Sequence, residues 1–98
     1  MSIQILKLIT GEELIGKIVV QDDAGIVIDN PANIHMAPTQ DSRMQLYLIP
    51  YAPYAETDQF TLKTEHVIMQ YEPNTDLLNK YIHMFGSGIQ IAGTGKMA

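Results

Sequence analysis

Residues 8–18, Leu8-Ile9-Thr10-Gly11-Glu12-Glu13-Leu14-Ile15-Gly16-Lys17-Ile18, are the stretch that decides the fold. They continue through residues 22–25, Asp22-Asp23-Ala24-Gly25, into residues 26–28, Ile26-Val27-Ile28. Apolar residues alternate with others on both sides of two short breaks that contain Gly11 and Gly25. This pattern is typical of half-buried strands joined by tight glycine turns. The stretch therefore predicts three consecutive antiparallel strands.

The rest of the chain adds further strands to these three. Segments rich in apolar, β-branched and aromatic residues alternate with clusters of proline, glycine and small polar residues. The five predicted strands are residues 3–10, 14–21, 26–36, 44–51 and 66–72. Residues 37–42 form a turn, and residues 60–62 resume strand character after an exposed loop at residues 52–59.

Gly16 and Pro31 interrupt two of the predicted strands. Gly16 has no side chain to pack, so it predicts a sharp bend or the close approach of another backbone. Pro31 has no N–H to donate, so it predicts a bulge, a bend or an unpaired side in the third strand. Short bent strands close into small barrels. The expected fold is therefore mainly β, a small five-stranded bent antiparallel barrel.

Residues 74–86 predict a C-terminal helix. Asn74-Thr75-Asp76 supplies a capping side chain and a carboxylate in the first turn. Apolar side chains then recur at helical spacing, at Leu77, Leu78, Tyr81, Ile82 and Phe85. Gly86 is predicted to end the helix, and a glycine-rich tail is predicted over residues 87–98. The apolar face either covers the barrel as part of its core or is free to bind a partner.

The composition limits the class of protein. The 98 residues fit one domain, residues 1–98, with a barrel over 1–73. A hydrophobic content of 46% with 17% charged residues predicts that some apolar surface is covered by another subunit. The absence of cysteine excludes disulfides and thiolate chemistry and fits a reducing compartment. With no signal peptide and no apolar run of about 18 residues, we expect a cytoplasmic protein without membrane contact.

No residue pattern points to catalysis, a cofactor or a metal. The sequence has no nucleophile paired with a base, no phosphate loop and no cofactor fingerprint, so we expect no enzymatic activity. His35, His66 and His83 are far apart, and only convergence with a carboxylate would make them metal ligands. The acidic pairs at residues 12–13 and 22–23 favour solvated turns over a divalent-ion site. The aromatic residues are candidates either for stacking on bases or for barrel packing and subunit contact: Tyr47, Tyr51, Tyr54, Phe60 and Tyr71.

The spacing Leu8-x-x-Gly11-x-x-Leu14-x-Gly16-x-Ile18, followed by Asp22, is similar to the first motif of the Sm/Lsm family. The segment from His66 to Pro73 resembles the last strand of Hfq, a family of bacterial Sm-like RNA chaperones. Ile26 adds to that likeness, because Hfq also has an apolar residue at this position. The resemblance also suggests a reduced, divergent member of the family, of the type found in phage genomes. The resemblance implies an Sm-like (SH3-like) barrel. It also implies a homo-oligomeric ring in which the fourth strand of one copy pairs with the fifth strand of the next.

The resemblance further implies a ring that binds single-stranded RNA or DNA, with a role in nucleic-acid processing. The loops that hold nucleic acid in the family correspond to residues 22–24 and 63–66, so the implied binding residues are Asp22, Asp23, Ala24, Lys63, Glu65 and His66. Ala24 stands where Hfq has a stacking aromatic residue, and Glu65 stands where the family has a basic one. With a net charge of −5, these differences favour an alternative, a non-enzymatic protein interaction or assembly module on the same barrel.

Overall fold

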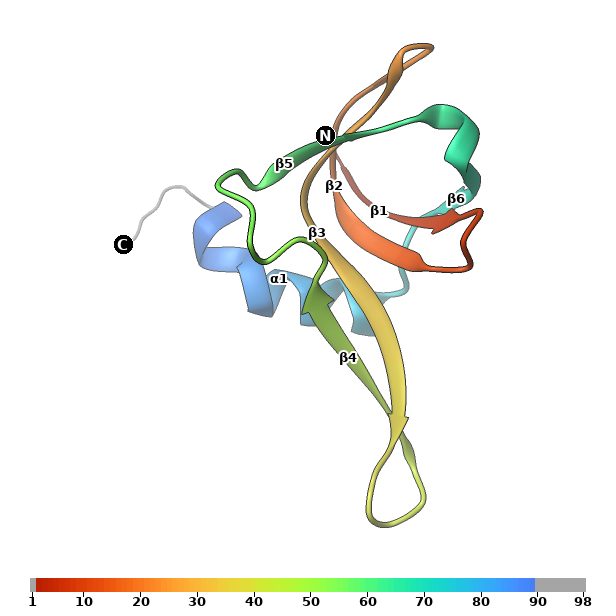
Figure 1. The fold of residues 1–98 in the computed structure, drawn as a ribbon. Helices are drawn as coiled ribbons and strands as arrows, with labels where there is room; N and C mark the ends of the chain where they lie inside the picture. The colour runs from red at the N-terminus through yellow and green to blue at the C-terminus, as the bar shows by residue number, and fades with distance from the viewer. Residues whose placement is uncertain (1, 90–98) are drawn as a thin grey trace.

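A computed structural model describes residues 2–89, which form a bent antiparallel sheet and a C-terminal helix (Figure 1). The strands are β1 (Ser2–Leu8), β2 (Glu13–Asp22), β3 (Gly25–Pro38), β4 (Met44–Pro50), β5 (Gln59–Leu62) and β6 (Val67–Tyr71). A single 3-10 turn (Thr64–His66) precedes β6, and α1 (Thr75–Ile89) follows it. The strand order is β4-β3-β2-β1-β6, and β5 also pairs with β3. Within residues 2–89, no helix is long and apolar enough to cross a membrane.

The long strand β3 explains why six strands take the place of the five that were predicted. Its first half pairs with β5, from Ile26 opposite Leu62 to Asp29 opposite Gln59. Its second half pairs with β4, beginning at Ala32 opposite Pro50. Strands β4 and β5 therefore share one side of β3 and together occupy the place of a fourth strand. The predicted fold class, a mainly β bent antiparallel sheet with a C-terminal helix, is confirmed.

A bulge at the middle of β3 bends the sheet. Ile15 lies opposite Ala32 while Lys17 lies opposite Asp29, so Asn30 and Pro31 together face the single residue Gly16. Asn30 has a positive φ of 49°. A Cβ atom on Gly16 would lie 2.5 Å from Cδ1 of Ile28 and 3.1 Å from the carbonyl oxygen of Asp29. Of the alternatives predicted for these two residues, the close approach of another backbone at Gly16 and a bulge at Pro31 are confirmed.

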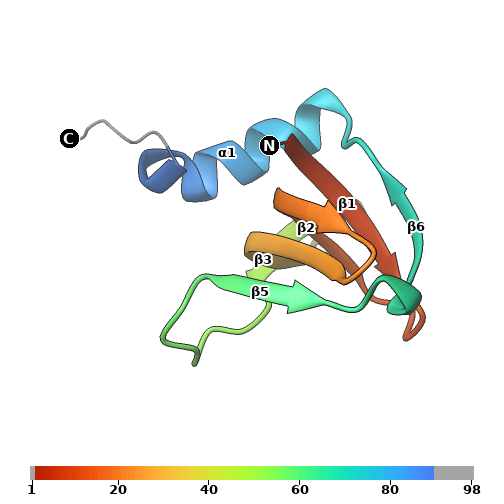
Figure 2. The ribbon, with the colours of Figure 1, turned by 90° about the horizontal axis from the view of Figure 1, so that it is seen from above.

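The bent sheet has an apolar cluster on each of its faces. The interior of the barrel is filled by Leu6, Leu8, Leu14, Ile18, Ile26 and Ile28, with Phe60, Leu62 and Val67 packed against them. Figure 2 shows β1, β2, β3 and β5 curving around this interior, with α1 outside them. Because side chains alternate between the faces of a strand, the intervening residues Ile5, Ile15 and Ala32 point to the opposite face.

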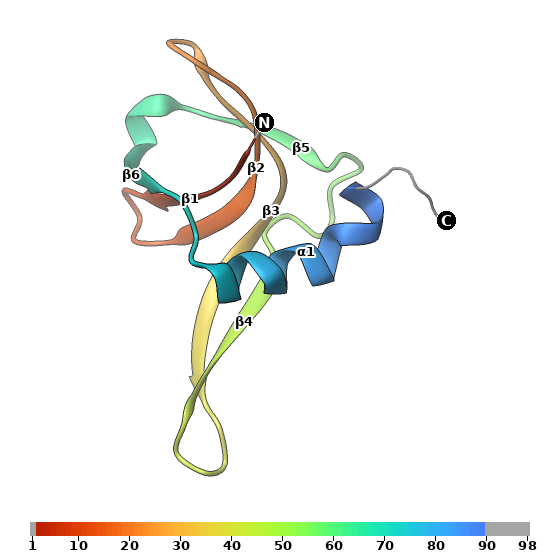
Figure 3. The same ribbon diagram turned by 180° about the vertical axis from the view of Figure 1, so that it is seen from behind.

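Helix α1 covers this opposite face of the sheet (Figure 3). Leu77 and Tyr81 are buried there, and Phe85 packs against them, with its ring centroid 4.8 Å from that of Tyr81. The side chain of Asn74 caps the helix, because its Oδ1 atom accepts a hydrogen bond of 2.9 Å from the N–H of Leu77. Of the two alternatives for the apolar face, the structure shows the first: the helix completes the core. Ile82 alone among the predicted face residues is exposed.

The predicted end of the helix at Gly86 is wrong. Helix α1 continues to Ile89, three residues beyond it. A glycine inside a helix costs only about 1 kcal/mol relative to alanine, so one glycine does not by itself stop a helix. The predicted glycine-rich tail, residues 87–98, falls mainly on residues 90–98, which lie outside the described residues.

The hydroxyl of Tyr81 connects the helix to the bulge by hydrogen bonds. It also makes the stability of the fold decrease at alkaline pH. Its hydroxyl donates to the carbonyl oxygen of Asn30 at 2.9 Å, and the carbonyl oxygen of Asp29 lies 3.2 Å away. Burial, together with the charge of Asp29, raises the pKa of Tyr81 well above its usual range. Above pH 10 the unfolded chain therefore releases a proton that the folded protein retains.

We expect the free energy of unfolding to decrease above pH 10, by up to about 1.4 kcal/mol per pH unit from this group. The variant Tyr81→Phe lacks the hydroxyl hydrogen bond, so its free energy of unfolding at pH 8 should be about 1 kcal/mol lower. Its free energy of unfolding should also decrease less steeply at high pH. Urea unfolding at several pH values from 8 to 11.5 measures both effects. Equal slopes for the two proteins would contradict the assignment to Tyr81.

Candidate functional site

The first loop predicted to bind nucleic acid is the turn between β2 and β3. Asp22 ends β2, and its Oδ1 atom accepts a hydrogen bond of 2.9 Å from the N–H of Ala24. Gly25 then begins β3 with a φ of 156°. A Cβ atom on Gly25 would lie 2.7 Å from the carbonyl oxygen of Leu62, so β5 runs close beside this turn. The Asp22 carboxylate therefore stabilises its own turn, as solvated turn carboxylates commonly do.

The second predicted loop runs from Lys63 to His66 and lies against two different parts of the barrel. Near its start, the hydroxyl of Thr64 donates to the carbonyl oxygen of Asp22 at 3.4 Å. At its end, the carbonyl oxygen of His66 accepts a hydrogen bond of 2.9 Å from the N–H of Ile9, beyond the end of β1. The structure thus brings the start of this loop to the turn at residues 22–24. It places His66 beside the turn between β1 and β2.

The two loops together form an acidic surface. The six predicted residues are all exposed, and they include three carboxylates, from Asp22, Asp23 and Glu65, against the one lysine, Lys63. Nucleic-acid affinity depends mainly on cations that neutralise phosphates. The charge of these loops therefore opposes phosphate binding, and Lys63 and His66 are the two groups among the six that could favour it.

A small apolar pocket of about 280 Å³ lies beside His66. Its lining residues are Leu8, Ile9, Thr10, Glu12, Tyr51, Leu62 and His66. The hydroxyls of Tyr51 and Thr10 both donate to Oε1 of Glu12, each at 3.1 Å. Burial and the adjacent carboxylate raise the pKa of Tyr51. The sequence pointed to His66 and Tyr51 separately, and their meeting at one pocket comes from the folding of the barrel.

The other aromatic candidates divide between packing and exposure. Phe60 packs on the barrel core, which agrees with barrel packing, one of the two alternatives for these aromatic residues. The hydroxyl of Tyr71 donates to Oε2 of Glu13 at 2.8 Å, and this carboxylate and burial raise its pKa. Tyr47 and Tyr54 are exposed. Across residues 2–89, no three histidine or carboxylate side chains converge to hold a metal ion.

Strands β4 and β6 each present an open edge with exposed apolar side chains. In the sheet formed by residues 2–89, β4 pairs with β3 alone and β6 pairs with β1 alone. Each strand therefore has one side whose backbone groups have no strand partner. Exposed apolar side chains lie along both, namely Met44, Tyr47 and Ile49 on β4 and Ile68, Met69 and Tyr71 on β6. Such edges promote aggregation unless another strand pairs with them.

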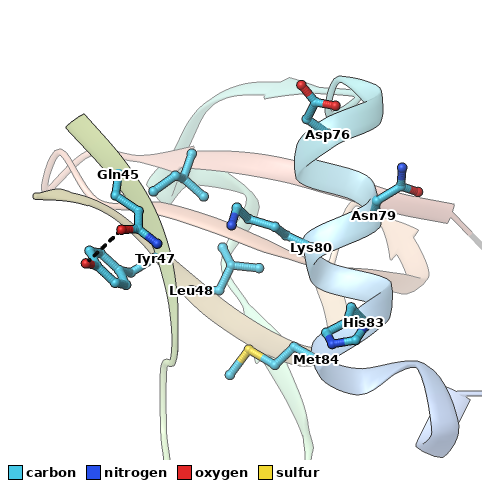
Figure 4. A pocket seen from close by; sticks show the side chains of 9 residues that line it. Gln45, Tyr47, Leu48, Asp76, Asn79, Lys80, His83 and Met84 are labelled. Atoms are coloured by element: carbon cyan, nitrogen blue, oxygen red, sulfur yellow. Dashed lines mark hydrogen bonds between the residues drawn. The ribbon is translucent and has the colours of Figure 1, made fainter. Parts of the chain in front are cut away.

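A groove of about 540 Å³ lies between β4 and α1 (Figure 4). Strand β4 contributes Gln45, Leu46, Tyr47 and Leu48, and the helix contributes Asp76, Asn79, Lys80, His83 and Met84. We call this groove the β4–α1 slot. Sequence patterns marked Asp76 as a first-turn carboxylate and His83 as a possible metal ligand, but they marked no helix residue as part of a groove, because these residues lie on the polar side of the helix. Their helical spacing was visible, but their neighbour β4 was not.

A family model described as Sm_like domain matches residues 5–82. The match begins within β1 and ends within α1, so it includes both loops, both open edges and most of the residues that line the β4–α1 slot. No curated protein matches the chain.

Proposed function

Because this chain belongs to the Sm-like family, whose model matches residues 5–82, we propose that it assembles into a homo-oligomeric ring. Proteins of this family form oligomeric rings and often bind RNA. The observation that carries the proposal is the pair of open apolar edges, β4 on one side of the sheet and β6 on the other. Pairing β4 of one copy with β6 of the next would satisfy the backbone groups of both edges.

A ring follows from the fact that the two edges are different. Contact between unlike surfaces generates a chain of copies, and this chain closes into a ring when the rotation between neighbours permits. Closure leaves neither the β4 edge nor the β6 edge exposed, which accounts for the exposed side chains of residues such as Ile49 on β4 and Ile68 on β6.

We further propose that the ring binds single-stranded RNA or DNA through the loops at residues 22–24 and 63–66. Lys63 is exposed beside the turn at Asp22, and a ring repeats it once per copy. Since Glu65 and the two aspartates surround it, we expect weak binding that decreases steeply as salt rises. The closer likeness to Hfq and a phage-type origin remain predictions, as do a cytoplasmic location and the lack of enzymatic activity.

Binding of fluorescent oligo-U, oligo-A and single-stranded DNA to the assembled protein tests this role. We expect Lys63→Ala and His66→Ala to weaken binding several-fold, because each removes a favourable group from the loops. Glu65→Gln is the matched control, for which we expect the opposite effect. Removing this carboxylate reduces the repulsion of phosphates, so binding should become stronger. All three variants are at exposed positions and should keep the fold.

The acidic loops favour a second candidate, a protein interaction or assembly module on the same ring. If no oligonucleotide binds at low salt, or if Glu65→Gln has no effect on binding, the nucleic-acid proposal is wrong. The assembly module then becomes the better account.

A further inference from the structure

The β4–α1 slot borders a strand at the edge of the sheet. Residues 45–48 of β4 line one wall of the slot, and within residues 2–89 β4 pairs with β3 alone. Figure 4 shows this arrangement, with β4 on one side of the slot and the α1 residues Lys80, His83 and Met84 on the other. An added strand on β4 would therefore run directly beside the helix.

The register of β6 indicates which of its side chains would face the helix in such a pairing. Met69 lies opposite Lys7, and Tyr71 lies opposite Ile5, which belongs to the cluster under α1. Residues paired directly across two strands share a face of the sheet. Met69 and Tyr71 therefore project to the α1 side. Leu46 and Leu48 of β4 also belong to that cluster.

We infer that the β4–α1 slot is the receptor for β6 of a neighbouring copy, with Met69 of that copy inserted between β4 and α1. In a cyclic ring every α1 lies on the same side, so the side chains of the added strand that face α1 enter the slot. The inference rests on the proposed ring and adds a second role for the helix: α1 covers its own sheet and also contacts the next subunit.

The charges at the slot are compatible with this occupant. The helix wall of the slot carries one lysine, Lys80, and one carboxylate, Asp76, so it has no net charge that would repel the glutamates flanking β6, Glu65 and Glu72. Met84 supplies an exposed apolar side chain in the slot, and methionine adapts its shape to a neighbouring side chain. The volume of about 540 Å³ leaves room for several side chains of the added strand.

Cysteine cross-linking tests the contact directly, because the chain contains no cysteine. We expect the double variant Met69→Cys/Met84→Cys, treated with a short thiol-specific cross-linker, to give a ladder of covalent multimers on a denaturing gel. The pair Met69→Cys/Tyr54→Cys is the control, since Tyr54 is 99% exposed and lies outside the slot. It should give no ladder above background.

A second pair of variants tests the energetic role of the slot. Met84→Glu should weaken subunit association at least tenfold, because it puts a carboxylate where the apolar side chain of Met84 would meet Met69 of the next copy. Ile82→Glu is its match on the same helix, since Ile82 is 36% exposed and Met84 42%, but Ile82 does not line the slot. It should leave association unchanged, and circular dichroism should show both variants folded.

The mass of the native protein distinguishes a failure of the slot contact from a failure of the ring. An oligomer that gives no ladder, or whose association is equally sensitive to Ile82→Glu and Met84→Glu, overturns the slot contact and leaves the ring in place. A monomer at every concentration overturns both.

Discussion

Placing a single glutamate on either open edge is expected to dissociate the ring into subunits of 10.9 kDa. The two variants are Ile49→Glu on β4 and Ile68→Glu on β6, at side chains that are 47% and 62% exposed. Each would bury a carboxylate without a partner between two strands, which costs several kcal/mol per contact. Because a ring repeats the contact at every boundary, we expect association to weaken by at least a hundredfold.

Light scattering during size-exclusion chromatography measures this change in mass. Val20→Glu is the matched control, since Val20 is 47% exposed but lies on β2, an inner strand of the sheet and not one of the two edge strands β4 and β6. It should keep the mass of the parent protein. Native mass in both edge variants would contradict pairing through these strands.

Mixing the two edge variants gives a sharper result. The Ile68→Glu chain keeps an intact β4 edge, and the Ile49→Glu chain keeps an intact β6 edge. An equal mixture can therefore form one sound contact but cannot continue from it. We expect dimers from the mixture and monomers from each variant alone. Larger species in the mixture would show that other surfaces also join the subunits.

The second large effect is expected at Gly16, where the bulge of β3 crosses β2. A Cβ atom there would lie 2.5 Å from Cδ1 and 2.6 Å from Cγ1 of Ile28, and Ile28 is fully buried. Gly16→Ala should therefore lower the free energy of unfolding by about 1–3 kcal/mol, as overpacking of a core does. For a domain whose total stability is about 5–15 kcal/mol, this is a large fraction.

Urea unfolding of a double-mutant cycle assigns the loss to this contact. Ile28→Ala removes the two nearest atoms that a Cβ on Gly16 would meet and leaves the carbonyl oxygen of Asp29 at 3.1 Å, so the combination Gly16→Ala/Ile28→Ala should lose less stability than the sum of the single variants. Gly86→Ala is a control within α1. There the nearest atom lies 3.2 Å away on Ile82, and alanine favours helix, so little or no stability should be lost. Additive effects at Gly16 and Ile28 would contradict the steric explanation.

The sequence by itself determined the local elements of this protein. Alternation around Gly11 and Gly25 located the first three strands, and Gly16 with Pro31 located the bulge, because backbone geometry limits what these residue types can do. Helical spacing located α1 and the buried residues Leu77 and Tyr81. These are local properties of a few neighbouring residues, so they can be read without knowledge of the fold.

Only the tertiary structure decided which segments meet and which edges stay open. It placed Thr64 at Asp22 but His66 at Ile9, and it put β4 and β5 on one side of β3. It also brought Lys80 and Met84 beside the open edge of β4. Strand pairing joins residues far apart in the chain, and a periodic pattern shows that a strand exists without naming its partner. The candidate subunit contacts lie on those partnerless edges, so they could be located only after the sheet had formed.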